Sequence, residues 1–532
     1  MNDSTLQAEA LADALYSVGV RDVVIAPGSR SAPLALALAR RNQFNRHVHI
    51  DERSAGFVAL GISKASGRPV ATVCTSGTAT ANFHPALLES SHSDVPFIVI
   101  TADRPSELQG IGSNQTTNQS QLFGTATRHF VAIEAGDSLS WLEDFPKIFD
   151  GLDGPVHINI AFREPLLPED SNSIPVTSVI PAFEVSTQAE KMAPALSELG
   201  ITSGQRGVVV VGHGLGTFSR QEISAWSTRL GWPVVAEDPL SHSAAIQHAS
   251  LLVGTTFASE KLQPEVALVI GKIGLSRSVM ALLTRTSRVI GIDSHHEVSN
   301  PLRKNDVQLA ALPRVDVDAD PKWLKAWHQA SAKVAGALAL PTWSEQNLAA
   351  IFARSLPSGS SLFIGSSRPI RDIEAFAAPR ADIEVFGNRG LAGIDGNTST
   401  AIGISRVRPG RTFAYLGDIA FLHDVNALLN DAPNLTVVVV DNNGGGIFST
   451  LPQRGVDHFE EVFGTPHDRD LKAIAAGFGI HVTRVGSLRE FELALSKEHA
   501  ALNVIVATMP SRDASADNLK SAIAAAEKAL AV

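Results

Sequence analysis

Short apolar runs alternate with amphipathic segments along nearly the whole chain. Runs of this kind, each followed by a segment with apolar residues at helical spacing, are typical of parallel sheets covered by helices. We therefore predict an α/β fold of doubly wound parallel sheets. The expected strands include 22–26, 70–75, 96–101 and 156–161 in a first block, 207–211, 232–236, 266–270 and 287–292 in a second, and 361–364, 383–386, 412–416, 435–440 and 502–507 in a third.

Three blocks of strands predict three α/β domains, at residues 1–180, 181–345 and 346–532. The first block ends in a Pro- and Ser-rich stretch, 164–181, which we expect to be an extended linker. The second block is followed by a polar segment near 322–335 that contains tryptophan and is expected to be helical. No close sequence repeat links the three blocks.

Two polar turns follow neighbouring strands of the third block. Gly417-Asp418 comes after the strand at 412–416, before a helix-like run at 421–429. Asp441-Asn442-Asn443-Gly444 comes after the strand at 435–440. Ligands of such sheets bind at the carboxyl ends of strands, and carboxylate and amide oxygens suit Mg²⁺. Each turn alone could be an ordinary Gly/Asn-rich turn, but the pair predicts a metal site.

Composition narrows the class of protein. The chain has 532 residues, 44% of them hydrophobic, and no apolar run long enough for a membrane helix. The net charge of −10 argues against a nucleic-acid partner, so an anionic ligand would need a local arginine cluster. The single cysteine, Cys74, excludes an intrachain disulfide. The N-terminus shows no signal peptide, and we expect a cytoplasmic protein.

Glu52 is the most informative acidic residue of the first block. It follows the strand-like segment 48–50, within Asp51-Glu52-Arg53. Such a tripeptide is most often a solvated charge run. However, Gly417-Asp418 followed by Asn442-Asn443, with 24 positions from Asp418 to Asn442, resembles the metal motif of thiamine diphosphate enzymes. This resemblance implies that Glu52 is the carboxylate that activates thiamine diphosphate. To bind the N1′ atom of the aminopyrimidine strongly it must be substantially buried.

Further motifs occur in order along the chain: Ala26-Pro27-Gly28-Ser29-Arg30-Ser31, Thr75-Ser76-Gly77-Thr78-Ala79, Thr101-Ala102-Asp103-Arg104-Pro105, Asn388-Arg389-Gly390, Gly393-Ile394-Asp395-Gly396 and Asn443-Gly444-Gly445-Gly446-Ile447-Phe448. This set resembles the family of 2-succinyl-5-enolpyruvyl-6-hydroxy-3-cyclohexene-1-carboxylate synthases, thiamine diphosphate enzymes of menaquinone biosynthesis. The resemblance is specific in the first and third blocks and weaker in the second.

The resemblance implies pyrimidine-binding, central and diphosphate-binding domains, in that order. It implies that thiamine diphosphate, with Mg²⁺ or Mn²⁺, decarboxylates 2-oxoglutarate and that the succinyl-semialdehyde carbanion adds in 1,4 fashion to isochorismate. Both substrates are dicarboxylates, so converging arginines are expected on physical grounds too.

The resemblance also implies roles for particular residues. The catalytic acid is Glu52, and the metal ligands are Asp418, Asn442 and Gly444. The cofactor contacts are Pro27, Glu52, Thr78, Ser367, Gly393, Ile394, Gly417, Asp418, Ile419, Asn442, Gly444 and Ile447. The isochorismate side has Ser29, Arg30, Arg104 and Gln115, and the acyl-donor side has Ser367, Arg371 and Arg389. Ile447 and Phe448 form an apolar wall.

Three positions depart from the family pattern. Arg277 stands where the family can have a lysine, and we count it as a candidate substrate residue. Ile419 replaces a glycine in the metal motif, and Asp441 stands where asparagine can occur. The extra carboxylate of Asp441 adds negative charge near the metal.

Thiamine enzymes of this type place the cofactor at a subunit interface. We therefore expect a homodimer or homotetramer in which Glu52 of one chain and Asp418 of its partner share a site. The expected partners are the two substrates and a second copy of the chain, without nucleic acid or membrane.

Two other functions stay open at this point. One is an acetolactate-synthase-like enzyme that uses pyruvate, although the arginine set favours dicarboxylates. The other is a non-catalytic module that binds thiamine diphosphate or a nucleotide, for which Glu52 would be unnecessary.

Three further features are not interpreted as sites. Gly212-His213-Gly214-Leu215-Gly216 lacks the full spacing of a dinucleotide loop, so neither NAD nor FAD is expected. His295-His296-Glu297 is expected to be a solvated turn rather than a zinc site. Cys74 is expected to be packed rather than nucleophilic.

Overall fold

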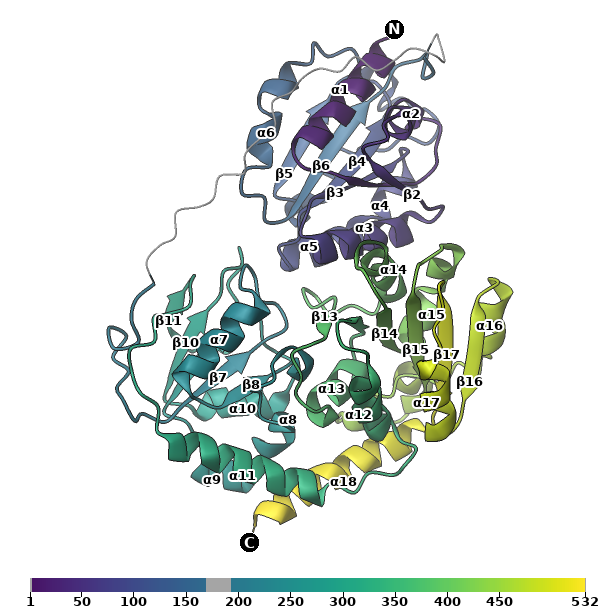
Figure 1. Cartoon of the computed structure of the whole chain (residues 1–532). Coiled ribbons are helices and arrows are strands. Elements are labelled where there is room, and N and C mark those ends of the chain that lie inside the picture. Colours follow the sequence, from purple (N-terminus) through teal and green to yellow (C-terminus); the bar gives the residue numbers. More distant parts are fainter. Residues whose placement is uncertain (1, 169–192, 532) are drawn as a thin grey trace. The chain divides into compact units, whose positions relative to one another are not determined.

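A computed structural model describes residues 2–168 and 193–531 of the chain. It contains three sheets in which all strand pairs are parallel, with helical segments between most successive strands (Figure 1). This confirms the predicted fold class. The expected linker at 164–181 lies outside the described residues from position 169 onward, as does the proposed domain boundary at 180.

The first sheet has the strand order β2-β1-β3-β4-β6-β5. Its strands are β1 (Asp22–Ile25), β2 (Asn45–Val48), β3 (Val70–Cys74), β4 (Phe97–Asp103), β5 (His129–Ile133) and β6 (Pro155–Ala161). Its helices are α1 (Asp3–Ser17), α2 (Ala32–Arg40), α3 (Glu52–Ser66), α4 (Thr78–Ala81), α5 (His84–His92) and α6 (Phe145–Ile148), with 3₁₀ turns η1 (Ser106–Leu108), η2 (Gly124–Ala126) and η3 (Ser140–Glu143).

The second sheet has the order β11-β10-β9-β7-β8. Its strands are β7 (Gly207–Val211), β8 (Val234–Ala236), β9 (Val266–Ile270), β10 (Arg288–Ile292) and β11 (Asn305–Leu309). Its helices are α7 (Arg220–Leu230), α8 (Ala249–Leu252), α9 (Thr256–Lys261), α10 (Arg277–Arg285) and α11 (Pro321–Ala337), with the 3₁₀ turn η4 (Pro239–Ser241).

The third sheet has the order β13-β12-β14-β15-β17-β16, which repeats the order of the first sheet strand for strand. Its strands are β12 (Ser361–Ile364), β13 (Glu384–Phe386), β14 (Thr412–Gly417), β15 (Leu435–Asp441), β16 (His481–Val485) and β17 (Asn503–Thr508). Its helical segments are α12 (Glu345–Ser355), α13 (Arg368–Phe376), α14 (Asn397–Val407), α15 (Asp418–His423), η5 (Val425–Leu429), η6 (Phe448–Thr450), η7 (Glu460–Gly464), α16 (Leu471–Gly477), α17 (Leu488–Ser496) and α18 (Arg512–Leu530).

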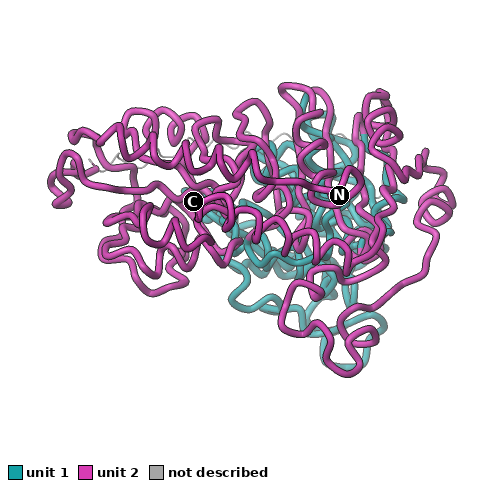
Figure 2. Tube along the Cα trace, turned by 90° about the horizontal axis from the view of Figure 1, so that it is seen from below, with its two compact units in different colours: residues 1–189, 390–409, 424–432 teal, residues 190–389, 410–423, 433–532 magenta. Residues whose placement is uncertain are grey.

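Contacts divide the chain into two compact units, coloured separately in Figure 2. Unit 1 comprises residues 1–189, 390–409 and 424–432, and unit 2 comprises 190–389, 410–423 and 433–532. Unit 1 therefore joins the first sheet to α14, which packs along α3. Unit 2 contains both the second and the third sheet.

The strands predicted from apolar runs are all present, with ends shifted by two residues at most. Strands β5, β11 and β16 were not predicted. All three are partly exposed edge strands, and β11 and β16 contain no apolar run, whereas the short run at 130–133 in β5 was missed. The strand expected at 48–50 ends earlier, at Val48. The helix expected at 421–429 is split at Asp424, whose buried carboxylate accepts hydrogen bonds from the backbone N–H and the hydroxyl of Ser399.

Candidate active site

The predicted metal turn of unit 2 is built around Asp418. Strand β14 ends at Gly417, and Asp418 begins α15 with 2% of its surface exposed. Its Oδ1 accepts a hydrogen bond from the Ile419 N–H at 2.7 Å, and its Oδ2 accepts one from the Gly444 N–H at 2.8 Å. The two turns predicted to meet at the sheet edge therefore do meet, through this carboxylate.

Asn442 presents an amide oxygen suited to a metal. Its Nδ2 donates to Oε1 of Glu345 at 2.8 Å. Its Oδ1 is buried and accepts no hydrogen bond among the described residues. An unpaired buried oxygen is costly, and a divalent cation with a preference for oxygen ligands would satisfy it. The donor set of this turn thus fits the metal that the sequence predicts.

Gly444 is required by close packing as well as by its backbone conformation. Its φ is +138°, and a Cβ atom added to it would lie 2.2 Å from the carbonyl oxygen of Gly464. Any side chain here would force the turn away from Asp418, whose carboxylate binds the Gly444 N–H.

His467 joins this turn and was not predicted. Asp418, Asp441 and His467 each offer a ligand atom, and these atoms lie within 4.8 Å of one another. The hydrogen bond to Asp418 raises the pKa of His467 above its ordinary value. Burial, followed by the charge of Asp418, raises the pKa of Asp441. His467 lies 49 positions after Asp418, so no local spacing could have revealed it.

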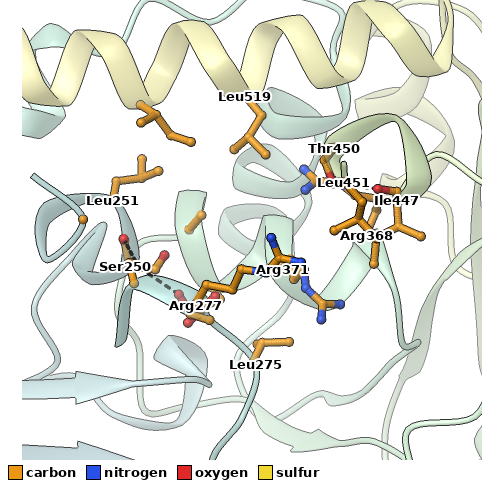
Figure 3. A pocket seen from close by; sticks show the side chains of 16 residues that line it. Ser250, Leu251, Leu275, Arg277, Arg368, Arg371, Ile447, Thr450, Leu451 and Leu519 are labelled. Carbon is orange, nitrogen blue, oxygen red and sulfur yellow. Dashed lines mark hydrogen bonds between the residues drawn. The ribbon is translucent and has the colours of Figure 1, made fainter. Parts of the chain in front are cut away.

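A cavity of about 430 Å³ lies within unit 2 (Figure 3). Its wall brings together Arg277, Arg371 and Ile447, three residues predicted separately from the sequence. The rest of the wall is mostly apolar, with the charged Arg368 and Glu374 added. A cavity with an apolar wall and converging guanidinium groups suits a small carboxylate with a short carbon chain.

Arg371 is the better buried of the two predicted arginines in this wall, whereas Arg277 is exposed. Burial, followed by the positive charge of Arg389, lowers the pKa of Arg371. Its Nη1 donates to the carbonyl oxygen of Ser367 at 2.7 Å. Ser367 has a φ of +75°, rare for a residue with a side chain and costly unless its surroundings impose it. The predicted donor-side residues Ser367 and Arg371 are therefore linked directly.

Arg389 and Phe448 do not line this cavity. Arg389 lies beside it, with Nη1 3.5 Å from the hydroxyl of Ser366. The ring of Phe448 packs against Phe463, with centroids 5.5 Å apart.

Two carboxyl groups near the arginines were missed by sequence reasoning. Glu374 lines the cavity, and burial followed by the charge of Glu237 raises its pKa well above the ordinary value. Glu237 accepts hydrogen bonds from the N–H groups of Gly274 and Leu275, and burial raises its pKa as well. Neither residue stands in a motif. Glu374 follows Arg371 by three positions on α13, whereas only the fold brings Glu237 close enough for its charge to act on Arg371.

Unit 1 contains a second arginine site at the carboxyl ends of its strands. Arg30 follows β1 and Arg104 follows β4, each with 9% of its surface exposed. Arg30 donates to the carbonyl oxygen of Phe162 at 2.9 Å. Burial, followed by the charge of Arg30, lowers the pKa of Arg104, so the two cations lie close enough to repel each other. Two nearby buried arginines form a strong receptor for a carboxylate.

Gln115 belongs to the same site. The Arg104 Nη1 donates to the carbonyl oxygen of Gln115 at 2.8 Å and to the hydroxyl of Ser76. The Gln115 side chain donates back to the Ser76 carbonyl at 3.0 Å. The predicted residues Pro27, Ser29, Thr78 and Gln115 are exposed at this strand edge. Ser76, which joins Arg104 to Gln115, belongs to the motif Thr75-Ser76-Gly77-Thr78-Ala79, but no role was predicted for it.

Glu52 is the first residue of α3 and is partly buried within unit 1. The Asp51 side chain caps the helix by accepting from the Ser54 N–H at 3.1 Å. The pKa of the Cys74 thiol is raised by burial and further by the charge of Glu52. Cys74 is fully buried, as predicted.

The candidate residues are thus divided between the units. Unit 1 holds Pro27, Ser29, Arg30, Glu52, Thr78, Arg104, Gln115, Gly393 and Ile394. Unit 2 holds Arg277, Ser367, Arg371, Arg389, Gly417, Asp418, Ile419, Asn442, Gly444, Ile447 and Phe448. Gly393 and Ile394 belong to unit 1 because the preceding residues, Gly390 and Leu391, donate their N–H groups to the Glu89 carboxylate.

One structural prediction about a polar segment was wrong. His295 does not lie in a solvated turn, because it is 6% exposed and its Nδ1 bonds to Asp293. Only His296 and Glu297 are exposed there. Among the described residues, no helix combines the length and apolar character needed to cross a membrane.

Comparison with known proteins agrees with this geometry. Residues 7–122 match the N-terminal TPP-binding domain of thiamine pyrophosphate enzymes, and residues 375–506 match their C-terminal TPP-binding domain. The chain therefore belongs to the thiamine pyrophosphate enzymes, and it is an enzyme of this class.

Full-length relatives define the family within that class. The 2-succinyl-5-enolpyruvyl-6-hydroxy-3-cyclohexene-1-carboxylate synthase of Thermobifida fusca is 42% identical, over 91% of this chain and 92% of its own. The proteins of the same name from Saccharopolyspora erythraea and Lysinibacillus sphaericus are 40% and 36% identical, each over at least 90% of both chains. The chain belongs to this family of synthases.

Proposed function

We propose that this enzyme decarboxylates 2-oxoglutarate and adds the remaining four-carbon unit in 1,4 fashion to isochorismate. The products are 2-succinyl-5-enolpyruvyl-6-hydroxy-3-cyclohexene-1-carboxylate and CO₂, a step of menaquinone biosynthesis. The observation on which the proposal chiefly rests is the cavity of unit 2, in which Arg277, Arg371 and Ile447 share one wall. Membership in the synthase family supports the same reaction.

The cofactor is thiamine diphosphate, held through Mg²⁺ or Mn²⁺. When bound, it supplies the electron sink for decarboxylation. Asp418, Asn442 and the Gly444 carbonyl would hold the metal, and Asn442 already presents an unpaired oxygen. The backbone at Gly417 and Ile419 and the side chain of Ile447 would contact the cofactor, as would Pro27, Thr78, Gly393, Ile394 and Ser367.

Glu52 would accept the hydrogen bond of the aminopyrimidine N1′ atom and set its protonation. A carboxylate acts strongly in this way only where water is excluded. Glu52 is partly exposed in a single chain. This supports the proposal of a homodimer, or a dimer of dimers, in which the cofactor and a partner subunit cover it.

Different arginines would bind the two substrates. Arg371 and Arg389, with Arg277 at the exposed rim, would bind the carboxylates of 2-oxoglutarate, and Ser367 would lie beside its reacting end. Arg30 and Arg104, with Ser29 and Gln115, would bind isochorismate. Ile447 and Phe448 would provide an apolar wall that keeps water from the reacting carbon. We place the reaction in the cytoplasm, where the lone thiol of Cys74 stays reduced.

The direct test is a two-substrate assay. The purified chain is incubated with thiamine diphosphate, Mg²⁺, 2-oxoglutarate and isochorismate, and CO₂ release and loss of isochorismate absorbance are followed together. We expect both signals only when both substrates are present, and neither when pyruvate replaces 2-oxoglutarate. Turnover with pyruvate instead would indicate an acetolactate-synthase-like enzyme. Tight cofactor binding without turnover of any oxoacid would indicate a non-catalytic module.

A further inference from the structure

Behind the metal turn of unit 2 lies a buried carboxyl group to which the proposed function gives no role. Glu345 is the first residue of α12 and has 2% of its surface exposed. It stands 97 positions before Asn442 and in no cofactor motif. Its Oε1 nevertheless accepts the hydrogen bond of the Asn442 Nδ2 at 2.8 Å.

This hydrogen bond decides which end of the Asn442 amide is anchored. An asparagine amide has a donating nitrogen and an accepting oxygen of nearly equal size, and only their partners distinguish the two orientations. A glutamate oxygen accepts from the nitrogen, whereas it would repel the amide oxygen if the group turned over. The Asn442 Oδ1 is thereby left buried and without a hydrogen-bond donor.

The carboxyl group is itself held in place. Ser344 caps α12 by accepting from the Asn347 N–H at 3.3 Å, which fixes the start of the helix. A carboxylate in the first turn is favoured by the helix dipole. Burial raises the pKa of Glu345, and the positive charge of Arg368 opposes this effect. Glu345 is therefore a stable acceptor, not a side chain that swings freely.

Glu345 and the metal turn also share a small cavity. Its volume is about 20 Å³, and its wall includes Glu345, Arg368, Gly417 and Asn442. Gly417 immediately precedes Asp418, so the cavity lies directly behind the strand ends that carry both side-chain ligands. The space holds one water molecule at most, so the Asn442 side chain has little room to swing away from Glu345.

We infer that Glu345 is a positioning residue of the metal site, which orients Asn442 so that its oxygen faces the cation. This inference rests on the proposed function, in which Asn442 is a metal ligand. Outer partners that orient metal ligands typically contribute 10- to 100-fold in metal affinity. Glu345 itself does not touch the cation, the cofactor or the substrate.

Metal binding is measured directly, by electron paramagnetic resonance of free Mn²⁺ during titration of the full-length chain with thiamine diphosphate and no substrate. We expect Glu345→Ala to raise the Kd for Mn²⁺ by up to about 100-fold. Glu345→Gln keeps the volume and one acceptor, but its new amide can also donate to the Asn442 oxygen. We expect a rise of about tenfold for this variant.

Gln346→Ala is the matched control. Gln346 is the next residue of α12 and is fully buried, and its amide nitrogen donates to the carbonyl and hydroxyl oxygens of Ser515 rather than to Asn442. We expect it to lower the melting temperature of the metal-free protein while leaving the Kd for Mn²⁺ unchanged. Excess Mn²⁺ should restore the activity of Glu345→Gln to near the wild-type kcat.

The outcomes separate the two proposals. If the wild-type chain binds Mn²⁺ and Glu345→Gln binds it with a Kd within about twofold, the role of Glu345 is overturned while the proposed function stands. If Gln346→Ala weakens the binding of Mn²⁺ as much as Glu345→Gln does, the loss of binding reflects lower stability of the protein, and the inference again fails. If the wild-type chain binds no Mn²⁺ with thiamine diphosphate, both proposals fail together.

Discussion

The first and third sheets have the same strand order, but the side chains at the carboxyl ends of their strands have opposite charges. In the first sheet, the segments after β1 and β4 present Arg30 and Arg104, two buried cations. In the third sheet, the segments after the equivalent strands β12 and β15 present Ser367 and Asn442, and β14 between them is followed by the carboxylate Asp418. In the proposed function, the first edge would bind an anion directly, and the other would bind one through a metal ion.

The supporting groups differ accordingly. The side-chain hydrogen bonds of Arg104 go to uncharged acceptors, the Gln115 carbonyl and the Ser76 hydroxyl, and the charge of the buried Asp103 also acts on it. Around the metal turn the supporting groups are carboxyl groups, and burial raises the pKa of Glu345 and raises that of Asp372 to about 7. Neutral acceptors hold the Arg104 guanidinium without cancelling its charge, whereas the carboxyl oxygen of Glu345 accepts from the Asn442 amide nitrogen. The same topology therefore supports two kinds of chemistry, as expected when function depends on strand-end residues.

The largest effects on activity are expected from substitution of two acidic residues, Glu52 in the unit of the first sheet and Asp418 at a strand end of the third. Glu52→Gln should lower kcat by about 10²- to 10⁴-fold while cofactor binding is kept, because an acid–base group is lost. Asp418→Ala should abolish binding of the metal and with it of thiamine diphosphate. Cofactor titration by fluorescence and steady-state kinetics would check both.

Mixing these two inactive variants tests whether the sheets of different chains form one site. Random exchange between dimers should restore about one quarter of wild-type activity, because half of the dimers are mixed and one site in each is intact. Tagged chains would verify the exchange. No recovery after verified exchange would rule out a site shared between subunits.

A smaller effect should separate the first sheet from the third by substrate. Arg104→Ala should raise the KM for isochorismate by about 10- to 150-fold, the range for a hydrogen bond to a charged group, and leave the KM for 2-oxoglutarate unchanged. Arg163→Ala is the control in the same unit, because Arg163 forms a half-exposed ion pair with Glu107. Equal changes in both KM values would contradict the assignment of this site to isochorismate.

The third sheet should show the converse selectivity. Arg371→Ala should raise the KM for 2-oxoglutarate by at least about tenfold, and Arg371→Lys should recover only part of it, because lysine keeps the charge without the planar pair of donors. Arg277→Ala should cost less, about fivefold at most, because Arg277 is exposed. Initial rates at saturating isochorismate would measure both. A larger effect at Arg277 than at Arg371 would reverse their proposed ranking.

The smallest effect concerns stability and is expected from Asp424 in unit 1. Burial raises the pKa of Asp424 to about 7, so the folded chain keeps its proton up to that pH, whereas the unfolded chain loses it near pH 4. Between these values the unfolded state binds fewer protons, so this group lowers stability as pH rises from about 4 to 7. Asp424→Asn should reduce by a few degrees the difference in Tm between pH 5.5 and pH 8. An unchanged difference would show that Asp424 does not contribute to it.

Strand positions and motif order were readable because both depend on local sequence. Buried parallel strands must be apolar on both faces, so β4, β9 and β15 stand out as continuous runs. In an edge strand such as β16 most residues are at least partly exposed, so no continuous apolar run marks the strand in the sequence. The meeting of Gly444 with Asp418 was expected for a similar reason, since adjacent strands of one sheet end at one edge.

The sequence by itself determined the fold class, the family and the residues at the strand ends. Only the tertiary structure decided which buried groups support them, such as Glu345 behind Asn442, Glu237 near Arg371 and His467 beside Asp418. These partners are far apart along the chain and belong to no periodic pattern. Their pairing depends on burial, where each unpaired polar group is costly and must find a partner in three dimensions.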